Sequence, residues 1–194
     1  LQWRYVDDTH IEIQRAGGFD RGSIHEFIYP ARDPKVMGLG LASIRDIVSC
    51  FREGKADDAG APNPLAAGTV RRALIFGASQ SGRVIRDFIY EGFNQSVRGG
   101  MVFEAAMPVV TGSRRSFVNA RFAQPGRYSR QHEDHWFDGD QFPFTYPELS
   151  DPLSGRTDGI LRRAQAADVC PKIAHLDADT ELWAGRGSLL VTDC

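Results

Sequence analysis

Apolar residues recur at helical spacing over one long stretch near the start of the chain. Between residues 33 and 54 they return every three or four positions, which places them along one face of a helix. Asp33-Pro34 is a good helix entry, and Gly54 is a stop signal. We therefore predict an amphipathic helix here, with Met37, Leu41, Ile44, Val48 and Phe51 on its apolar face.

The middle of the chain switches from strand to helix and back. The stretch over residues 70–76 turns into a short apolar run that ends at Gly77 and is typical of a strand buried on both faces of a parallel sheet. A helix is predicted from about Ser81 to about Gly92, and a second strand over 101–108. Strand, helix and strand at this spacing form a βαβ unit, so we predict an α/β fold.

Three shorter patterns complete the predicted elements. Residues 24–29 read as a strand that Pro30 stops. Residues 158–167 have a helical pattern, and residues 171–176 predict one more strand.

Apolar residues in the segment 111–154 follow neither the helical nor the strand spacing, and the segment is rich in aromatic residues and proline. A long patternless segment is unusual in a compact domain unless it has a binding role. We interpret it as a lid-like or cap-like insertion within a single partial domain spanning residues 1–194. Trp136 and Phe142 in this segment, and Trp183 further along, are candidates for contact with a substrate. The alternative is a covering segment with its own small apolar cluster.

Composition and charge narrow the possible partners. The chain has 194 residues, of which 42% are hydrophobic and 25% charged, as in an ordinary globular domain. The net charge is -2 and Lys and Arg form no dense run, which argues against nucleic acid or an anionic membrane. No apolar stretch approaches the ~20 residues of a membrane span. Because the chain begins at Leu1 and not at Met, we expect an internal piece, and compartment and oligomeric state stay undetermined.

Metal chemistry has weak support. The three cysteines form no Cys-x-x-Cys pair, which excludes a zinc ribbon. His132 and His135, with Asp138 and Asp140 nearby, could bind a metal, but their spacing does not match H-E-x-x-H. We favour a solvated polar loop and predict no metal site.

The segment from Gly77 to Gly82 is the candidate for catalysis. A buried strand, a sharp turn of small residues and a helix follow one another, and Ser79 lies in the turn. This order is that of a nucleophile elbow, in which strain keeps the serine hydroxyl exposed above the sheet. Small residues two before and two after, Gly77 and Ser81, allow so tight a turn. The N–H of Gln80 at the helix start is then placed to stabilise an oxyanion.

The same segment allows two other interpretations. The spacing of Gly77 and Gly82 is that of a phosphate-binding P-loop, but Arg83 and Val84 stand where that motif needs Lys and Ser/Thr. A purely structural turn is the second alternative. The dinucleotide fingerprint G-x-G-x-x-G is absent, and we predict no cofactor. Ser81 is a less suitable nucleophile than Ser79 because bulkier residues frame it.

A serine nucleophile needs an acid and a histidine, which follow it in that order in this type of hydrolase. Asp177, Asp179 and Glu181 follow the last predicted strand, and any of them could be the acid. No histidine follows Glu181, and His175 lies close to the acids in sequence. We expect the catalytic histidine beyond Cys194.

Several motifs together resemble a branch of the α/β-hydrolase superfamily with a G-x-S-Q-S-G-R elbow. The resemblance spans nearly the whole chain, and it rests on residues 36–46, 77–83, 90–94, 121–125 and 180–183.

This resemblance implies a parallel-rich sheet flanked by helices, with Ser79 as nucleophile and Glu181 as acid. It also implies a longer protein, in which early strands precede Leu1 and the histidine follows Cys194. We expect an α/β-hydrolase core that is incomplete at both ends and nearly inactive by itself. The parent would be a serine carboxylic-ester hydrolase acting on a small-molecule ester. The alternative is a non-catalytic ligand-binding protein of the same fold.

Overall fold

The computed structural model describes residues 1–19, 29–65, 68–116, 118, 121–122 and 141–191. The chain divides into two compact units, Leu1–Pro34 and Lys35–Cys194. The strand predicted over residues 24–29 lies outside the described residues except for its last position.

The first unit contains a β-hairpin. Strands β1 (Gln2–Tyr5) and β2 (Ile11–Gln14) pair antiparallel, with Trp3 opposite Ile13. Asp7 holds the connecting turn, because one of its carboxylate oxygens accepts the backbone N–H of Thr9 at 2.7 Å.

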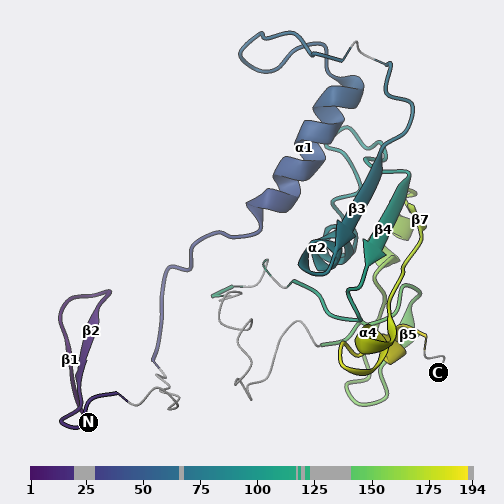
Figure 1. Ribbon diagram of the computed structural model, residues 1–194. Helices are drawn as coiled ribbons and strands as arrows, with labels where there is room; N and C mark the ends of the chain where they lie inside the picture. The colour runs from purple at the N-terminus through teal and green to yellow at the C-terminus, as the bar shows by residue number, and fades with distance from the viewer. Residues whose placement is uncertain (20–28, 66–67, 117, 119–120, 123–140, 192–194) are drawn as a thin grey trace. The chain divides into compact units, whose positions relative to one another are not determined.

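The second unit is built on a three-stranded parallel sheet. The strands are β3 (Leu74–Ala78), β4 (Ala105–Val109) and β7 (Lys172–Ile173), in the order β3-β4-β7 (Figure 1). Both neighbouring pairs are parallel. The predicted α/β class is therefore confirmed, and the strands end within three residues of their predicted ends.

Three described helices contribute to the core of this unit. They are α1 (Leu39–Glu53), α2 (Gln80–Tyr90) and the short α3 (Arg162–Ala166). Helix α2 packs directly on β3 and β4. Helix α1 begins later than Asp33-Pro34 suggested, directly after Gly38, whose φ of 81° is not helical. Its end at Gly54 and the bounds of α2 agree with the sequence pattern.

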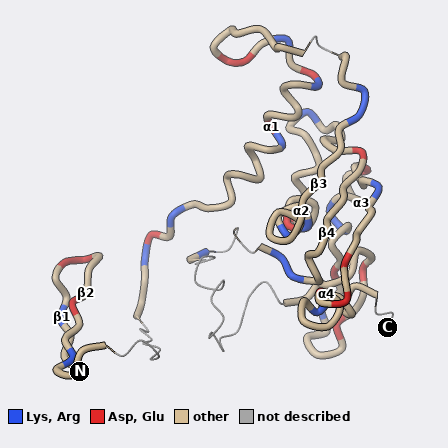
Figure 2. Tube along the Cα trace, in the orientation of Figure 1, with Lys and Arg blue, Asp and Glu red and all other residues tan. Residues whose placement is uncertain are grey.

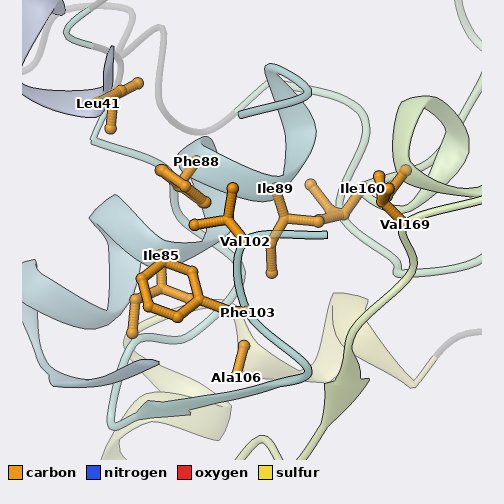
Figure 3. Close-up of a cluster of buried hydrophobic side chains, with 10 residues drawn as sticks. Leu41, Ile85, Phe88, Ile89, Val102, Phe103, Ala106, Ile160 and Val169 are labelled. Atoms are coloured by element: carbon orange, nitrogen blue, oxygen red, sulfur yellow. The ribbon is translucent and has the colours of Figure 1, made fainter. Parts of the chain in front are cut away.

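One hydrophobic core joins these helices to one face of the sheet. Figure 3 shows side chains from α1, α2, β4 and the α3 region converging on Phe88 and Ile89 of α2. The buried apolar set is Leu41, Ile85, Phe88, Ile89, Val102, Phe103, Ala106, Ile160, Ala164 and Val169.

The prediction that the β3 strand is buried on both faces was wrong for the described residues. Ile75 faces the core, but Leu74 and Phe76 are 73% and 68% exposed. Met107, which pairs with Phe76 in register, is 38% exposed on the same side. The physical reason is that the core helices lie on the opposite face of the sheet.

Smaller elements lie between and after the main ones. Strands β5 (Leu149–Ser150) and β6 (Thr157–Asp158) pair antiparallel, and α4 (Asp179–Trp183) is followed by a 3-10 turn, η3 (Gly187–Leu190). Basic and acidic residues are interspersed along the described chain (Figure 2). Among the described helices, none combines the length and apolar character that a membrane span requires.

Candidate active site

Ser79 occupies the turn between β3 and α2 in a strained backbone conformation. Its φ is 55° and its ψ is −120°, which a residue with a side chain rarely adopts. Its N–H donates to the carbonyl of Val109 at 2.8 Å, and its own carbonyl accepts the N–H of Arg83 at 3.1 Å. Ser79 is exposed. The turn is thus fastened to both β4 and α2 while the serine faces outward.

Two glycines permit this turn. A Cβ on Gly77 would lie 2.8 Å from the backbone carbonyl group of Ser81. A Cβ on Gly82 would lie 2.1 Å from Cγ2 of Thr111 and 2.9 Å from the carbonyl oxygen of Gly77. The sequence argument identified Gly77 but assigned the second small position to Ser81, which is exposed. Gly82 has the closer approach, and only the packing of Thr111 reveals it.

Gln80 is the first residue of α2. The first N–H groups of a helix have no partner within the helix, and they carry its positive dipole end. The side-chain oxygen of Gln80 accepts a hydrogen bond from Nη1 of Arg83 at 3.2 Å. This contact holds the Gln80 side chain toward the first turn of the helix.

Glu181 lies on α4, beyond the carboxyl ends of the strands (Figure 1). Its Oε2 accepts the N–H of Ala178 at 3.3 Å. Burial lowers the pKa of Arg83, repulsion from Arg114 lowers it further, and the carboxylate of Glu181 opposes both. Glu181 is therefore close enough to act on a side chain only four residues after Ser79.

Asp177 serves a different purpose from Glu181. Its Oδ1 accepts the backbone N–H groups of Thr111 and Gly112 at 2.8 and 3.2 Å. Its Oδ2 lies 3.1 Å from Nε2 of His175. The carboxylate thereby clamps the loop after β4 to the segment after β7. Asp179, the third candidate acid, is exposed in the first turn of α4.

His175 is enclosed by this clamp. Its Nε2 also lies 3.0 Å from Oγ1 of Thr111, and its Nδ1 lies 2.6 Å from the hydroxyl of Tyr146. Burial lowers the pKa of His175, against the opposing charge of Asp177. Both ring nitrogens are thus engaged within the protein.

The structure accounts for part of the aromatic set. Phe142 lies 6.3 Å from Phe144 between ring centroids, and the guanidinium of Arg156 lies over its ring. Trp183 is 79% exposed at the end of α4. Trp136 lies outside the described residues, as do His132, His135, Asp138 and Asp140. Within the described residues, no group of three or more His, Cys, Asp or Glu could hold a metal.

Arg86 is a residue that the sequence analysis missed. It is fully buried on α2, and its Nη2 donates to the carbonyls of Ser113 and Phe144 at 3.2 and 2.7 Å. Its guanidinium also lies 5.1 Å from the ring centroid of Tyr146. Arg86 therefore anchors the end of the 111–154 segment to the core. Its position along the helix relative to Phe88 and Ile89 is equally compatible with an arginine on the surface, so the sequence pattern did not reveal that it is buried.

A parallel βαβ unit with a strained serine at its strand-to-helix turn is typical of α/β-hydrolase-fold proteins. The sequence matches the family described as "Alpha/beta hydrolase domain" over residues 2–193, and the chain belongs to this family. Searches of curated proteins and of solved structures found no match. The family indicates hydrolase activity in general.

Proposed function

We propose that the protein is a serine hydrolase that cleaves carboxylic esters through an acyl-enzyme formed on Ser79. The observation that carries this proposal is the backbone of Ser79, an exposed residue held at a φ of 55° between β3 and α2. Strain of this kind persists only where the surroundings impose it, and it is concentrated at functional sites. Here Gly77 and Gly82 leave the space that the strained turn needs.

In the proposed mechanism, the Ser79 hydroxyl oxygen attacks the ester carbonyl carbon. The N–H of Gln80 donates to the oxyanion, and the positive end of the α2 dipole favours the same charge. The alcohol leaves with a proton, and water then releases the acid from Ser79. Loss of one oxyanion donor lowers turnover by ~10²–10³ in enzymes of this chemistry.

Glu181 is the proposed acid that orients the catalytic base. It lies on α4, which follows β7, and the turn after α4 contacts the loop after β4, because the carbonyl of Gly185 accepts the N–H of Ser113 at 3.2 Å. Asp177 is less suitable because both of its carboxylate oxygens already have partners. His175 is not proposed as the base, since Thr111, Asp177 and Tyr146 occupy its two ring nitrogens.

The segment 111–154 is proposed as the lid of this site. Its described end is fastened to the core, because Arg86 binds the carbonyl of Phe144. Trp136, Phe142 and Trp183 are the proposed contacts with an apolar part of the substrate.

Labelling with a fluorophosphonate, followed by peptide mapping, tests the nucleophile. We expect one adduct on Ser79 that is lost in Ser79→Ala and retained in the matched control Ser81→Ala. An adduct on Ser81 would show that the wrong serine was chosen. A folded protein without any adduct would contradict the esterase mechanism and favour a non-catalytic ligand-binding protein of this fold.

A further inference from the structure

Arg83 lies one helical turn after Ser79, and its side chain lies at the same end of the sheet. Its Nη1 donates to the side-chain oxygen of Gln80 at 3.2 Å, and its Nε donates to the carbonyl of Thr111 at 3.4 Å. The residue is only half-buried. A guanidinium has five N–H donors, so further donors of Arg83 are available to a ligand beside the serine.

Charged groups of both signs act on Arg83. Burial lowers its pKa, Arg114 lowers it further, and the carboxylate of Glu181 opposes both. The N-terminal end of α2 adds its partial positive charge. None of the described carboxylates lies within ion-pair distance of Arg83.

The position of Arg83 is fixed by the loop that it contacts. The backbone N–H of Thr111 is held by Asp177, and its hydroxyl lies 3.0 Å from His175. Thr111 is completely buried. Its carbonyl is therefore a rigid acceptor for Arg83, so that the guanidinium is placed before any ligand arrives. A donor held in place before binding loses less conformational freedom when the ligand binds.

We infer that Arg83 is a specificity-determining residue that binds a free carboxylate on the ester substrate. A guanidinium fork matches the planar geometry of a carboxylate, and the pairing is stronger than a bond between neutral groups. The substrate class is then a half-ester of a dicarboxylic acid. Water adds across the ester bond, so the products are the dicarboxylic acid and an alcohol that leaves with a proton. This inference rests on the proposed esterase function.

Two chromogenic esters of the same shape test the inference. One is the mono-4-nitrophenyl ester of adipic acid, whose free carboxylate is too far along the chain to attack its own ester readily. The other is methyl 4-nitrophenyl adipate, in which that carboxylate is capped. The measured quantity is the ratio of their kcat/KM values in the protein carrying this sequence. We expect a preference for the charged ester of roughly 10- to 100-fold, the range of a charge-assisted hydrogen bond.

Variants then assign the preference to Arg83. Arg83→Gln is expected to bring the ratio close to one, mainly through KM for the charged ester. Arg83→Lys keeps the charge and is expected to recover part of the ratio. Arg114→Gln is expected to lower it by a smaller factor. The matched control is Arg98→Gln, which changes the net charge by the same amount. Arg98 is an exposed residue that precedes β4.

Equal kcat/KM values for the two esters in the unmodified protein would overturn the inference, as would an unchanged ratio in Arg83→Gln. If Arg83→Gln fails to fold, an unchanged ratio in both Arg83→Lys and Arg114→Gln would overturn it as well. Fluorophosphonate labelling separates this failure from failure of the proposed function. A Ser79 adduct without charge preference removes only the inference, whereas no adduct and no hydrolysis of either ester removes both.

Discussion

Replacing Gly82 by alanine tests whether the strained turn at Ser79 depends on contact between α2 and the loop after β4. The added Cβ would lie 2.1 Å from Cγ2 of Thr111 and 2.9 Å from the carbonyl oxygen of Gly77. Thr111 cannot move away at little cost. It is completely buried, its hydroxyl donates to the carbonyl of Gly112 at 2.8 Å, and the same oxygen lies 3.0 Å from His175.

The expected cost follows from opposing contributions. Overpacking of a close-packed site costs about 1–3 kcal/mol, and losing a Thr111 hydrogen bond adds about 0.5–1.5 kcal/mol. Alanine in a helix gains up to about 1 kcal/mol over glycine. We therefore expect Gly82→Ala to lower the free energy of unfolding by about 1–3 kcal/mol, or the Tm by about 2–10 °C.

Urea and thermal denaturation measure this effect, and two other variants define its cause. Thr111→Ser removes the Cγ2 atom and keeps the hydroxyl, so Gly82→Ala should cost less in that background by about 1 kcal/mol. Gly40→Ala is the matched control, because it lies in α1 with nothing within 4 Å of the added Cβ. It should stabilise the protein by about 0.5–1 kcal/mol.

A Gly82→Ala protein as stable as Gly40→Ala would refute the reasoning. So would an equal cost of Gly82→Ala with Thr111 and with serine at that position, since the Cγ2 contact would then be irrelevant. The rate of fluorophosphonate labelling should fall with Gly82→Ala, because the serine turn shifts when α2 moves.

Three other predictions concern buried polar groups, each measured by urea denaturation. Asn94→Ala should lower the free energy of unfolding by about 2–4 kcal/mol. The buried Asn94 amide makes two hydrogen bonds to the backbone of Phe103 and donates one to the carbonyl of Val169. A loss under about 1 kcal/mol would contradict this prediction. Arg86→Lys should cost about 2 kcal/mol, since an ammonium group cannot reproduce the two carbonyl contacts and the stacking; an unchanged urea midpoint would disprove the anchoring role. Burial lowers the pKa of His175 in the folded protein below its ordinary value of 6.5. As the pH falls, the unfolded state therefore binds the proton before the folded state does. The free energy of unfolding should fall as the pH drops below 6.5 toward the folded pKa. That fall should be smaller in His175→Gln, and an identical pH profile would exclude the histidine as its source.

Much of the fold could be predicted from local pattern. The spacing of apolar residues predicted α2 nearly to the residue and the end of α1 at Gly54. Runs of β-forming residues predicted β3, β4 and β7, and the helix between β3 and β4 predicted that these two strands are parallel. These features are readable because side-chain periodicity reports how the backbone turns within one element. The late start of α1 was missed because a glycine at positive φ leaves no periodic signal.

The candidate site was likewise predictable from the sequence only in part. The sequence alone placed Ser79 at a tight strand-to-helix turn, because Gly77 and the helix pattern lie next to it in the chain. Only the tertiary structure showed that Gly82 has no room for a side chain, that Asp177 is occupied by loop N–H groups, and that Arg86 is buried. Each of these depends on contact with a segment distant in sequence. Packing between distant segments sets space, burial and partners, and a local pattern carries no information about them.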